Sequence, residues 1–526
     1  MPDDTISRTR GETLNKMSKK CVALIAFFTA STVAACSSSS SGSRTSLDAA
    51  GYLPQGRASQ SKIQHIVIIV QENRSFDNFF DCFPGTDCAK NAPGPGPQPG
   101  PTSLASPCPN PVATPTPGPT PTPIPIAFGT KLPDYDIDHT YCSAFITAYD
   151  GGRLDGFYWE GSTQAGVPTK TYAYQVVAQK HIQPYWDLAS QYVLADRTFA
   201  TQASGSFTAH QDLIRGDTLI DSTHAVVDNP WPTSDWGCPA KNDVTSLLTT
   251  SSRPNALQYL VHQGPFPCFA YTTLRDSLDA KSVSWKYYVP IWPDNGGQLW
   301  NAFAAVAAVY SNKGSEYPNK QAPFTCTKSC VSWPETNVFC DISGSTASPC
   351  PSPNPPGTVG LPAVSWVIPD GEDSDHYNPV NGRLVDDGPD WVASVVNAIG
   401  GSSYWKSTAI IVVWDDWGGF YDHVPPPQLD YEGLGFRVPM IIVSAYAKKG
   451  YISHTQYEFG SILKFAESTF GLSSLGTTDV RAHNITDAFD FSQAPRKFVP
   501  IKLLQKNHDR SYFLHRAPSN EPVDTE

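Results

Sequence analysis

The sequence predicts an α/β fold with a mostly parallel central sheet. Short runs rich in Val and Ile alternate along the chain with segments of helical length, which is the pattern of strands separated by helices. The runs are largely apolar, as expected for strands that are buried on both faces of a sheet. The chain of 526 residues is 40% hydrophobic and 12% aromatic, which is ample for a large core.

The individual elements follow from these patterns. Short apolar runs containing β-branched residues predict four strands, over residues 63–70, 363–368, 409–414 and 438–443. Apolar residues at helical spacing predict three helices, over residues 184–192, 391–398 and 457–470. We find no internal repeat.

The first residues carry the signals of export. Lys19 and Lys20 precede the apolar run 21–35, and the sequence Val-Ala-Ala-Cys that ends at Cys36 is similar to a bacterial lipoprotein processing box. We therefore expect residues 1–36 to be a lipoprotein-type signal peptide, with Cys36 lipidated after cleavage. An ordinary signal peptide cut nearby, or a chance apolar stretch, are the alternatives.

The rest of the chain is organised around one domain. A Ser-rich linker is expected over residues 37–58, a single domain over 59–500, and a C-terminal tail over 501–526. Two Pro-rich segments, near 90–126 and 346–358, interrupt otherwise globular sequence and are expected to be surface insertions.

Charge and cysteine content restrict the partners and the compartment. A net charge of −12 without a block of basic residues in the body of the chain argues against a nucleic-acid partner. Beyond Cys21 and Cys36, an even number of cysteines in an exported chain predicts disulfides. These are Cys82, Cys88, Cys108, Cys142, Cys238, Cys268, Cys326, Cys330, Cys340 and Cys350. Half of a zinc site at Cys326 and Cys330 is a weaker alternative.

Hard oxygen ligands follow two of the predicted strands. Glu72 and Asn73 come after the first strand, and Asp415 and Asp416 come after the third. Groups at the carboxyl ends of strands in an open α/β sheet face the ligand crevice, so these four residues are expected to meet. Such an acidic cluster repels itself unless a cation is bound. Taken alone, Glu72 and Asn73 also fit a polar turn in which Asn73 caps a helix.

Six segments of the chain resemble, in order, motifs of the bacterial phosphoesterase family that contains non-haemolytic phospholipase C and acid phosphatase. They are QENRSFDNFF, DHTYCSAFITAYDGGRLDGF, SGSFTAHQDLIRG, WVIPDGEDSDHYNP, VVWDDWGGFYDHVPPP and RVPMIIVSAYAKKGYISHTQYEFGSILKFAESTFGL. The resemblance implies a phosphoesterase domain over 59–500, folded as an α/β/α sandwich similar to alkaline phosphatases. It also implies that Glu72, Asn73, Asp415 and Asp416 hold one divalent metal ion, which can be Ca, Mg, Mn or Zn.

The same resemblance places the nucleophile on Ser206. The family motif often carries Gly-Pro before the nucleophilic hydroxyl, whereas this chain has Ser204 and Gly205. Ser204 and Thr208 are therefore rival candidates. A serine hydroxyl is a weak nucleophile until a metal or a base activates it, which agrees with a site next to acidic metal ligands.

Three histidines inside the matched motifs are candidates for catalysis. His139, His376 and His423 each follow an aspartate, and they are expected to face phosphate or to protonate a leaving group. His423 can instead brace the loop of Asp415. A purely structural role is the alternative for each of them. The tryptophans are expected to pack in the core rather than to line a lipid pocket.

These features together predict an exported, metal-dependent phosphoesterase that hydrolyses phosphate esters through a phosphoserine intermediate. The expected substrate is a phosphate ester or a phospholipid, and acid phosphatase and phospholipase C activities both remain open. The expected location is the periplasm or the cell surface, with a lipid anchor at Cys36 in the membrane. The alternative is a non-catalytic binding lipoprotein on the same fold.

Overall fold

The computed structural model describes residues 62–98, 122–130, 136–162, 169–232, 236–249, 258–292, 297–319, 323–377, 387–517 and 519. All of them belong to one compact unit, Ser59–Glu526. The expected signal peptide, the Ser-rich linker and Cys36 lie outside the described residues. Within the described part of the chain, none of the helices is both long and apolar enough to cross a membrane.

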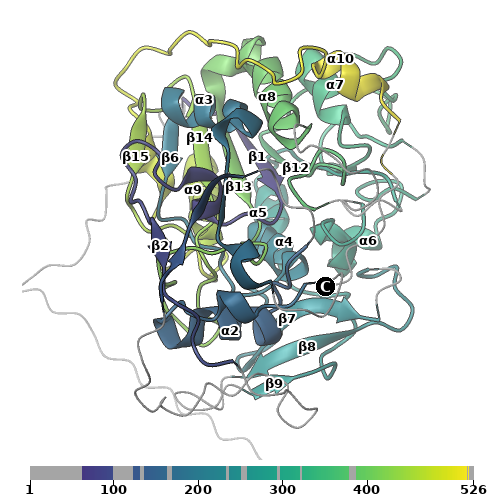
Figure 1. Ribbon diagram of the computed structural model, residues 1–526. Helices are drawn as coiled ribbons and strands as arrows, with labels where there is room; N and C mark the ends of the chain where they lie inside the picture. Colours follow the sequence, from purple (N-terminus) through teal and green to yellow (C-terminus); the bar gives the residue numbers. More distant parts are fainter. Residues whose placement is uncertain are drawn as a thin grey trace, which may run out of the picture. The chain divides into compact units, whose positions relative to one another are not determined.

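An eight-stranded sheet forms the centre of the unit, in the order β11-β10-β12-β1-β13-β14-β6-β15 (Figure 1). Its strands are β1 (His65–Gln71), β6 (Val193–Ala195), β10 (Trp285–Tyr288), β11 (Cys330–Ser332), β12 (Val364–Val367), β13 (Thr408–Trp414), β14 (Met440–Ser444) and β15 (Tyr451–Ser453). All neighbouring pairs are parallel except those of β14, which runs antiparallel to β13 and to β6. The predicted α/β class with a mostly parallel sheet is confirmed.

The four predicted strands correspond to β1, β12, β13 and β14, the middle of the sheet. All residues of β13, and all of β1 after His65, are buried, as the largely apolar runs predicted. Four further strands, which are only three or four residues long, were not predicted: β6, β10, β11 and β15.

Helices form two packed groups around the sheet. One group contains α3 (Gln183–Gln191), α7 (Asn337–Ser343), α8 (Asp387–Gly400) and α10 (Arg510–His515), in which α8 contacts the other three. In the other group, α4 (Ser206–Arg215) packs against α5 (Leu274–Ala280) and α9 (Phe459–Phe470). Figure 1 shows α3 and α8 above the strands β1 and β12, and α4 and α5 below them. The helices predicted over 184–192, 391–398 and 457–470 are α3, α8 and α9.

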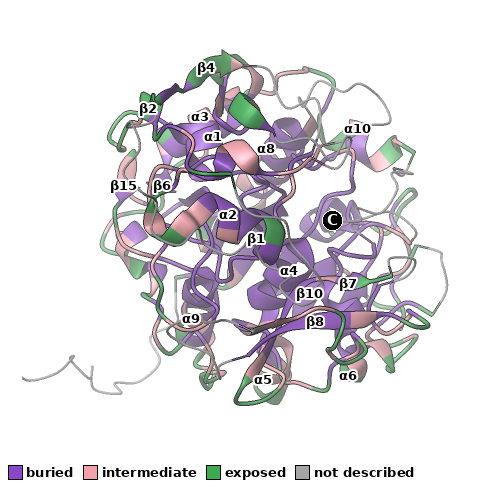
Figure 2. Cartoon of the chain, turned by 60° about the horizontal axis from the view of Figure 1, so that its bottom comes forward, coloured by how far each residue is buried: buried purple, intermediate pink, exposed green. Residues whose placement is uncertain are grey.

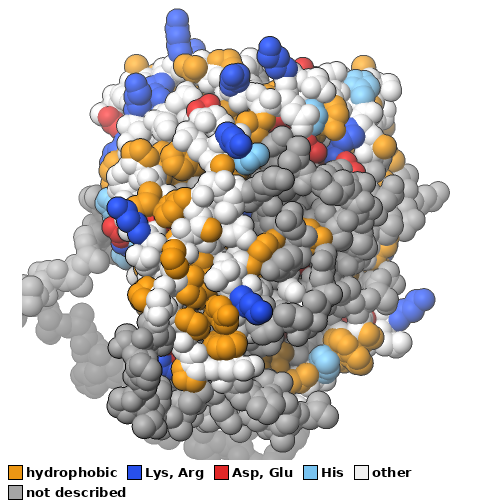
Figure 3. All heavy atoms as spheres, viewed as in Figure 1, with side chains coloured by type: hydrophobic (Ala, Val, Ile, Leu, Met, Phe, Trp, Pro, Cys, Tyr) orange, Lys and Arg blue, Asp and Glu red, His pale blue; other side chains and the backbone are white. Residues whose placement is uncertain are grey.

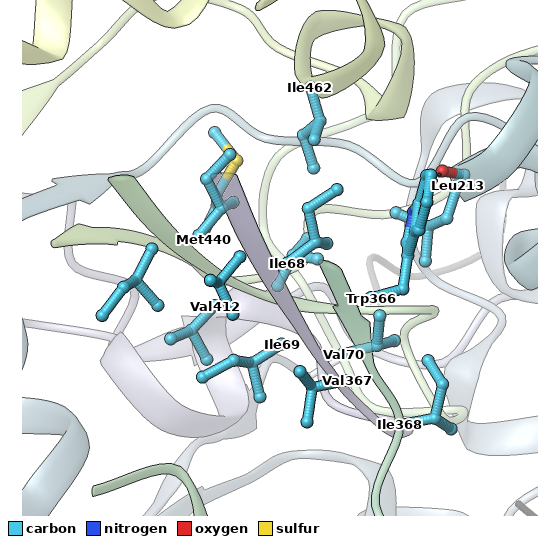
Figure 4. Packing of buried hydrophobic residues seen from close by; sticks show 14 of the residues in the cluster. Ile68, Ile69, Val70, Leu213, Trp366, Val367, Ile368, Val412, Met440 and Ile462 are labelled. Atoms are coloured by element: carbon cyan, nitrogen blue, oxygen red, sulfur yellow. Dashed lines mark hydrogen bonds between the residues drawn. The ribbon is translucent and has the colours of Figure 1, made fainter. Parts of the chain in front are cut away.

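The core between the second group of helices and the sheet is closely packed. Ile68 of β1 and Met440 of β14 lie beneath Ile462 of α9 (Figure 4). Trp366 of β12 lies beside Leu213 of α4 and donates a hydrogen bond from Nε1 to its carbonyl oxygen, at 3.1 Å. Full burial of an apolar side chain of this size contributes about 1.5–3 kcal/mol, so this packing fixes α4 against the sheet.

Aromatic side chains pack mainly in the interior, as the sequence analysis favoured. Trp391, Trp405, Trp414 and Trp417 are buried, whereas Trp159 and Trp186 are partly buried. A second buried cluster surrounds Trp417. On the face drawn in Figure 3, Lys and Arg side chains stand apart from one another among hydrophobic and uncharged groups.

Among the described residues, three small sheets lie outside the central one. The strands β7 (His224–Trp231), β8 (Val244–Thr249) and β9 (Gln258–Leu260) form an antiparallel sheet that the sequence analysis did not find. The other two pair β2 (Asn91–Ala92) with β3 (Ile124–Pro125), and β4 (Ala127–Thr130) with β5 (Gln175–Val177). Much of the first Pro-rich segment lies outside the described residues.

Four disulfides occur among the described residues. They join Cys82 to Cys88, Cys238 to Cys268, Cys326 to Cys330, and Cys340 to Cys350. The disulfide between Cys326 and Cys330 excludes the alternative of a zinc half-site there. Cys142 is also disulfide-bonded, and Cys108 lies outside the described residues.

Part of the expected C-terminal tail is folded onto the domain. Ile501 and Phe513 belong to the main core, and α10 packs on α8. Arg516 forms ion pairs with Asp370, Glu372 and Asp373, the residues that follow β12. The domain therefore continues beyond residue 500, because these side chains bury apolar area and charge against it.

Candidate active site

The ends of β1 and β13 bring the four predicted metal ligands together. The two strands are parallel neighbours with Gln71 opposite Trp414, so the residues that follow each strand lie side by side. The backbone N–H of Asn73 donates to Asp415 Oδ1 at 3.0 Å. Glu72, Asn73, Asp415 and Asp416 are each at most 1% exposed.

Ser206 lies against this acidic group. It is the first residue of α4, a helix that is buried from residue 206 to 214 (Figure 2). Its Oγ donates toward Asp416 Oδ2 at 3.3 Å and toward Asn73 Oδ1 at 3.4 Å. Both distances are long for an O–H donor, so the contacts orient the hydroxyl without holding it tightly.

The two rival hydroxyls point elsewhere. Ser204 Oγ donates to Asp228 Oδ1 at 3.2 Å and accepts from the backbone N–H of Asp228 at 2.8 Å. Thr208 Oγ1 donates to the carbonyl oxygen of Gly205 at 3.0 Å. Of the three candidates, the structure brings Ser206 to the acidic group.

His210 joins the site, although the sequence analysis did not select it. It lies one helical turn after Ser206, so both side chains leave the same face of α4. His210 Nε2 is 2.9 Å from Glu72 Oε1 and 3.8 Å from Asp415 Oδ2. Burial lowers the pKa of His210 to about 4 despite the charge of Asp415, so the imidazole is neutral at pH 7.

This set of side chains fits a divalent cation. One donor atom each of Glu72, His210 and Asp415 lies within 4.8 Å of the others, and all three residues are buried. Asp415 Oδ2 accepts no hydrogen bond within the described part of the chain. Burial and the charge of Asp415 raise the pKa of Asp416 to about 8, which indicates negative charge that the surrounding histidines do not compensate. Carboxylate oxygens with one neutral imidazole suit Mn, Zn, Mg or Ca.

His139 faces the same group. Its Nδ1 lies 2.8 Å from the carbonyl oxygen of Ile137, which fixes the ring. Its Nε2 is 3.4 Å from Asn73 Nδ2 and 3.7 Å from Asp416 Oδ2. The side chain is 1% exposed, so His139 is part of the buried site.

His376 lies on the side of the site nearer to solvent. Its Nδ1 is 2.7 Å from the carbonyl oxygen of Tyr377, and its side chain is 8% exposed. The indole of Trp300 lies 6.5 Å from the ring of His210 and 5.8 Å from the ring of His376. The charge of His376 acts on Asp416, where it lowers the pKa against the larger effect of burial.

His423 belongs to a neighbouring cluster instead. Its Nδ1 is 2.6 Å from Asp77 Oδ2, and Arg437 binds both Asp77, at 2.7 Å, and Asp422, at 2.8 Å. The hydrogen bonds of His423 in the described structure are to Asp77 and Arg437. The structure therefore brings His139 to Asn73 and Asp416, whereas it places His423 beside helix α1 (Phe76–Phe80).

Asp375 orients the loop before His376. Its Oδ2 accepts from Tyr185 at 2.8 Å and from Trp414 at 2.9 Å, and its backbone N–H donates to Gln71 at 2.8 Å. Burial raises the pKa of Asp375 to about 6, although Arg74 and these donors act in the opposite direction. The loop is thus tied to the ends of β1 and β13.

Sequence comparison identifies related proteins. Residues 63–473 match the family model of the phosphoesterase family. The chain is similar to phospholipase C B of Mycobacterium tuberculosis, with 26% identity over 492 residues that cover 88% of this chain and 83% of that protein. Phospholipase C A of the same organism is 24% identical over 475 residues, covering 83% and 79%. Non-specific phospholipase C1 of Arabidopsis thaliana is 30% identical over 142 residues, covering 22% and 27%.

Structure comparison finds weaker likeness. A protein in the alkaline phosphatase superfamily from Vibrio parahaemolyticus matches with 13% identity over 59% of this chain and 66% of that chain. The TM-score of this match is 0.31.

Proposed function

Since the chain belongs to the phosphoesterase family and is a phosphoric ester hydrolase, we propose that it acts through a phosphoserine formed on Ser206. The observation that carries the proposal is the contact of Ser206 Oγ with Asp416 and Asn73 at the ends of β1 and β13. Ser204 and Thr208, the other hydroxyls in the motif, are engaged in local hydrogen bonds.

The acidic group would hold a divalent cation through Glu72, Asn73, Asp415 and Asp416, with His210 as a further ligand or as a partner that orients Glu72. When bound, such an ion stabilises negative charge on phosphoryl oxygens and favours ionisation of a nearby hydroxyl. This proposal explains why these four polar side chains are almost completely buried in the fold.

The chain's own groups divide the reaction into two steps. In the first step, Ser206 Oγ forms a bond to phosphorus, and the ester oxygen leaves with the bonding electron pair. The hydroxyl proton passes to the ionised form of Asp416, whose Oδ2 already accepts the hydrogen bond of Ser206 and whose raised pKa of about 8 makes it a stronger base than an ordinary carboxylate. In the second step a water molecule attacks phosphorus and the bond from phosphorus to Oγ breaks. Ser206 Oγ takes back the proton held by Asp416, and the proton that water loses passes to His376, which gave its own proton to the leaving alkoxide in the first step.

Two histidines assist these steps. His139 Nε2 faces Asn73 and Asp416, a position from which a protonated ring donates to a phosphoryl oxygen. His376, on the side nearer to solvent, protonates the leaving alkoxide. His423 contributes indirectly in this proposal, because it is bound to Asp77 and braces α1.

The substrate class is a phosphate ester, and we favour a phospholipid because the relatives that cover most of the chain are phospholipases C. Export, a lipid anchor at Cys36 and a periplasmic or cell-surface location complete the proposal. A non-catalytic binding lipoprotein is disfavoured, because the buried hydroxyl of Ser206 beside the intact acidic group would have no role in it.

The test is hydrolysis of p-nitrophenyl phosphate and p-nitrophenyl phosphocholine by the purified chain. We expect turnover that a chelator abolishes and that a divalent cation restores, and none with Ser206→Ala. Preference for the phosphocholine ester supports a phospholipase C, whereas preference for the monoester supports a phosphatase. Turnover that is fully retained after exhaustive chelation would contradict the proposed role of the cation.

A further inference from the structure

Strand β7 supplies the cap of the helix that carries Ser206. Gly205 is the N-cap residue of α4 and has no side chain with which to accept a hydrogen bond. The backbone N–H of Phe207 donates instead to Asn229 Oδ1, at 3.1 Å. N-terminal N–H groups of a helix lack partners within the helix, so Asn229 does what a Ser or Asp usually does at the N-cap.

The pairing of β7 is irregular at the position where this strand meets the helix. The pairing of β7 with β8 shifts in register between Val227 and Trp231. Asp228, within that interval, has a φ of 59°, a left-handed conformation that is uncommon for residues other than glycine. Irregular strand positions of this kind redirect side chains, and backbone in sparsely populated regions occurs often at functional sites.

Asp228 ties two segments of the active site to each other. Ser204, two residues before Ser206, donates to Asp228 Oδ1 at 3.2 Å. The backbone N–H of Tyr141, two residues after His139, donates to the same oxygen at 2.6 Å. The other carboxylate oxygen accepts from Tyr259 of β9 at 2.7 Å. One buried carboxylate therefore fixes both segments relative to the small sheet.

Gly205 brings these groups into contact. A Cβ atom at this position would lie 3.6 Å from His139 Cδ2 and 3.8 Å from Asn229 Oδ1. The imidazole of His139, the turn at Gly205 and the amide of Asn229 are thus neighbours. The amide of Asn229 therefore lies beside the groups that are proposed to act on phosphate. The hydrogen bonds of Ser206 Oγ go to Asn73 and Asp416, whereas Asn229 accepts from the backbone of Phe207.

We propose that Asp228 and Asn229 are positioning residues that set the placement of Ser206 relative to His139. This inference rests on the proposed function, because it assigns these residues to the Ser206 nucleophile. Neither residue exchanges a proton with substrate. Their effect is geometric, since a small displacement of a nucleophile costs much of the rate.

The experiment compares variants at Asp228 and Asn229 with the parent protein and with a matched control variant. Asn229→Ala is expected to lower kcat about 30- to 100-fold while KM for p-nitrophenyl phosphocholine changes less than about threefold. Asp228→Asn keeps an oxygen acceptor for Tyr141 and Ser204, so it should retain clearly more kcat than Asp228→Ala. The control is Asn397→Ala, which removes an asparagine that accepts from the backbone N–H of Ile501 at 2.8 Å, on helix α8.

Amide hydrogen exchange supplies a second readout that needs no activity. Faster exchange over residues 205–209 in Asn229→Ala, and not in Asn397→Ala, is the expected result. Unchanged exchange with a kcat equal to that of the control would overturn the inference. If the parent protein itself hydrolyses no phosphate ester, the proposed function fails, and the exchange data alone decide whether the pair holds the turn. If Asp228→Ala does not fold, the comparison of Asn229→Ala with its control still decides.

Discussion

His210 Nε2 lies 2.9 Å from Glu72 Oε1, and both side chains are completely buried. A carboxylate in this position is stabilised by a hydrogen bond or by a cation. The imidazole is neutral at pH 7 because burial lowers its pKa to about 4. A neutral imidazole is the form that binds metals, so His210 either binds the proposed cation or holds Glu72 in place for it.

His210→Gln is expected to weaken divalent-cation binding by about 10- to 100-fold, the usual effect of removing a group that binds or orients a ligand. Titration calorimetry with Mn²⁺ measures the change. His483→Gln is the control, because His483 is exposed. Equal affinities in the two variants would show that His210 takes no part in cation binding.

Asp415→Asn tests the acidic group itself. The substitution replaces a buried carboxyl group beside Asp416 by a neutral amide of similar size, so we expect the protein without cation to melt at the same temperature as the parent or higher. The rise in Tm that a divalent cation causes should be largely lost, and kcat should fall by at least about 100-fold. Differential scanning calorimetry with and without the cation, together with turnover, provides the check. Parent-like kcat with a parent-like rise in Tm would reject Asp415 as a ligand.

The pair of His423 and Asp77 predicts a pH dependence of stability. Burial alone would lower the pKa of His423, but the hydrogen bond and charge of Asp77, with the charge of Asp422, raise it overall. The pair therefore stabilises the fold fully below about pH 6.5, the unfolded value, and this contribution is lost as pH rises through the raised folded value.

The difference in Tm between the parent and His423→Gln should accordingly be larger at about pH 5.5 than at about pH 9. Thermal melts at both pH values measure it. His483→Gln should show no such trend. The same difference at both pH values would mean that protonated His423 does not stabilise the fold.

Much of the sheet was predictable because its central strands are buried on both faces. The apolar runs 66–70 of β1 and 409–414 of β13 have no polar position to break them, and the two strands end directly before Glu72 and Asp415. The short strands β6 and β15 carry too few residues for a pattern to emerge. The antiparallel direction of β14 is a property of its pairing with β13 and β6, which no local residue pattern specifies.

Ser206 and His139 were selected through the resemblance to the family motifs, whereas residue patterns alone predicted candidate site residues where these follow a strand. Glu72, Asn73, Asp415 and Asp416 were found in this way, whereas His210 was missed because one histidine inside a helix has no local signature. Its spacing of four residues from Ser206 was the available signal. Asp228 and Asn229 lie on a small sheet that was not predicted, so nothing linked them to Ser206.

The ion pairs of Arg516 predict a large effect at the C-terminus. Arg516→Gln leaves the buried Asp370 and Asp373 without their shared guanidinium, so the free energy of unfolding should fall by about 3 kcal/mol. Urea unfolding measures the loss. Arg510→Gln is the control, because Arg510 is exposed and begins α10, the helix that directly precedes Arg516. A loss no larger than that of the control would show that the segment adds little to stability.

The most direct measurement is acid trapping of the intermediate. Parent protein mixed with phosphate-labelled substrate and quenched at low pH should carry a phosphoryl group on Ser206, identified by peptide mass spectrometry. Ser206→Ala should carry no label, and Thr208→Ala should still be labelled at Ser206. A label on Ser204 or Thr208 in the parent, or rapid turnover with no label on any residue, would contradict the assignment of Ser206 as the nucleophile.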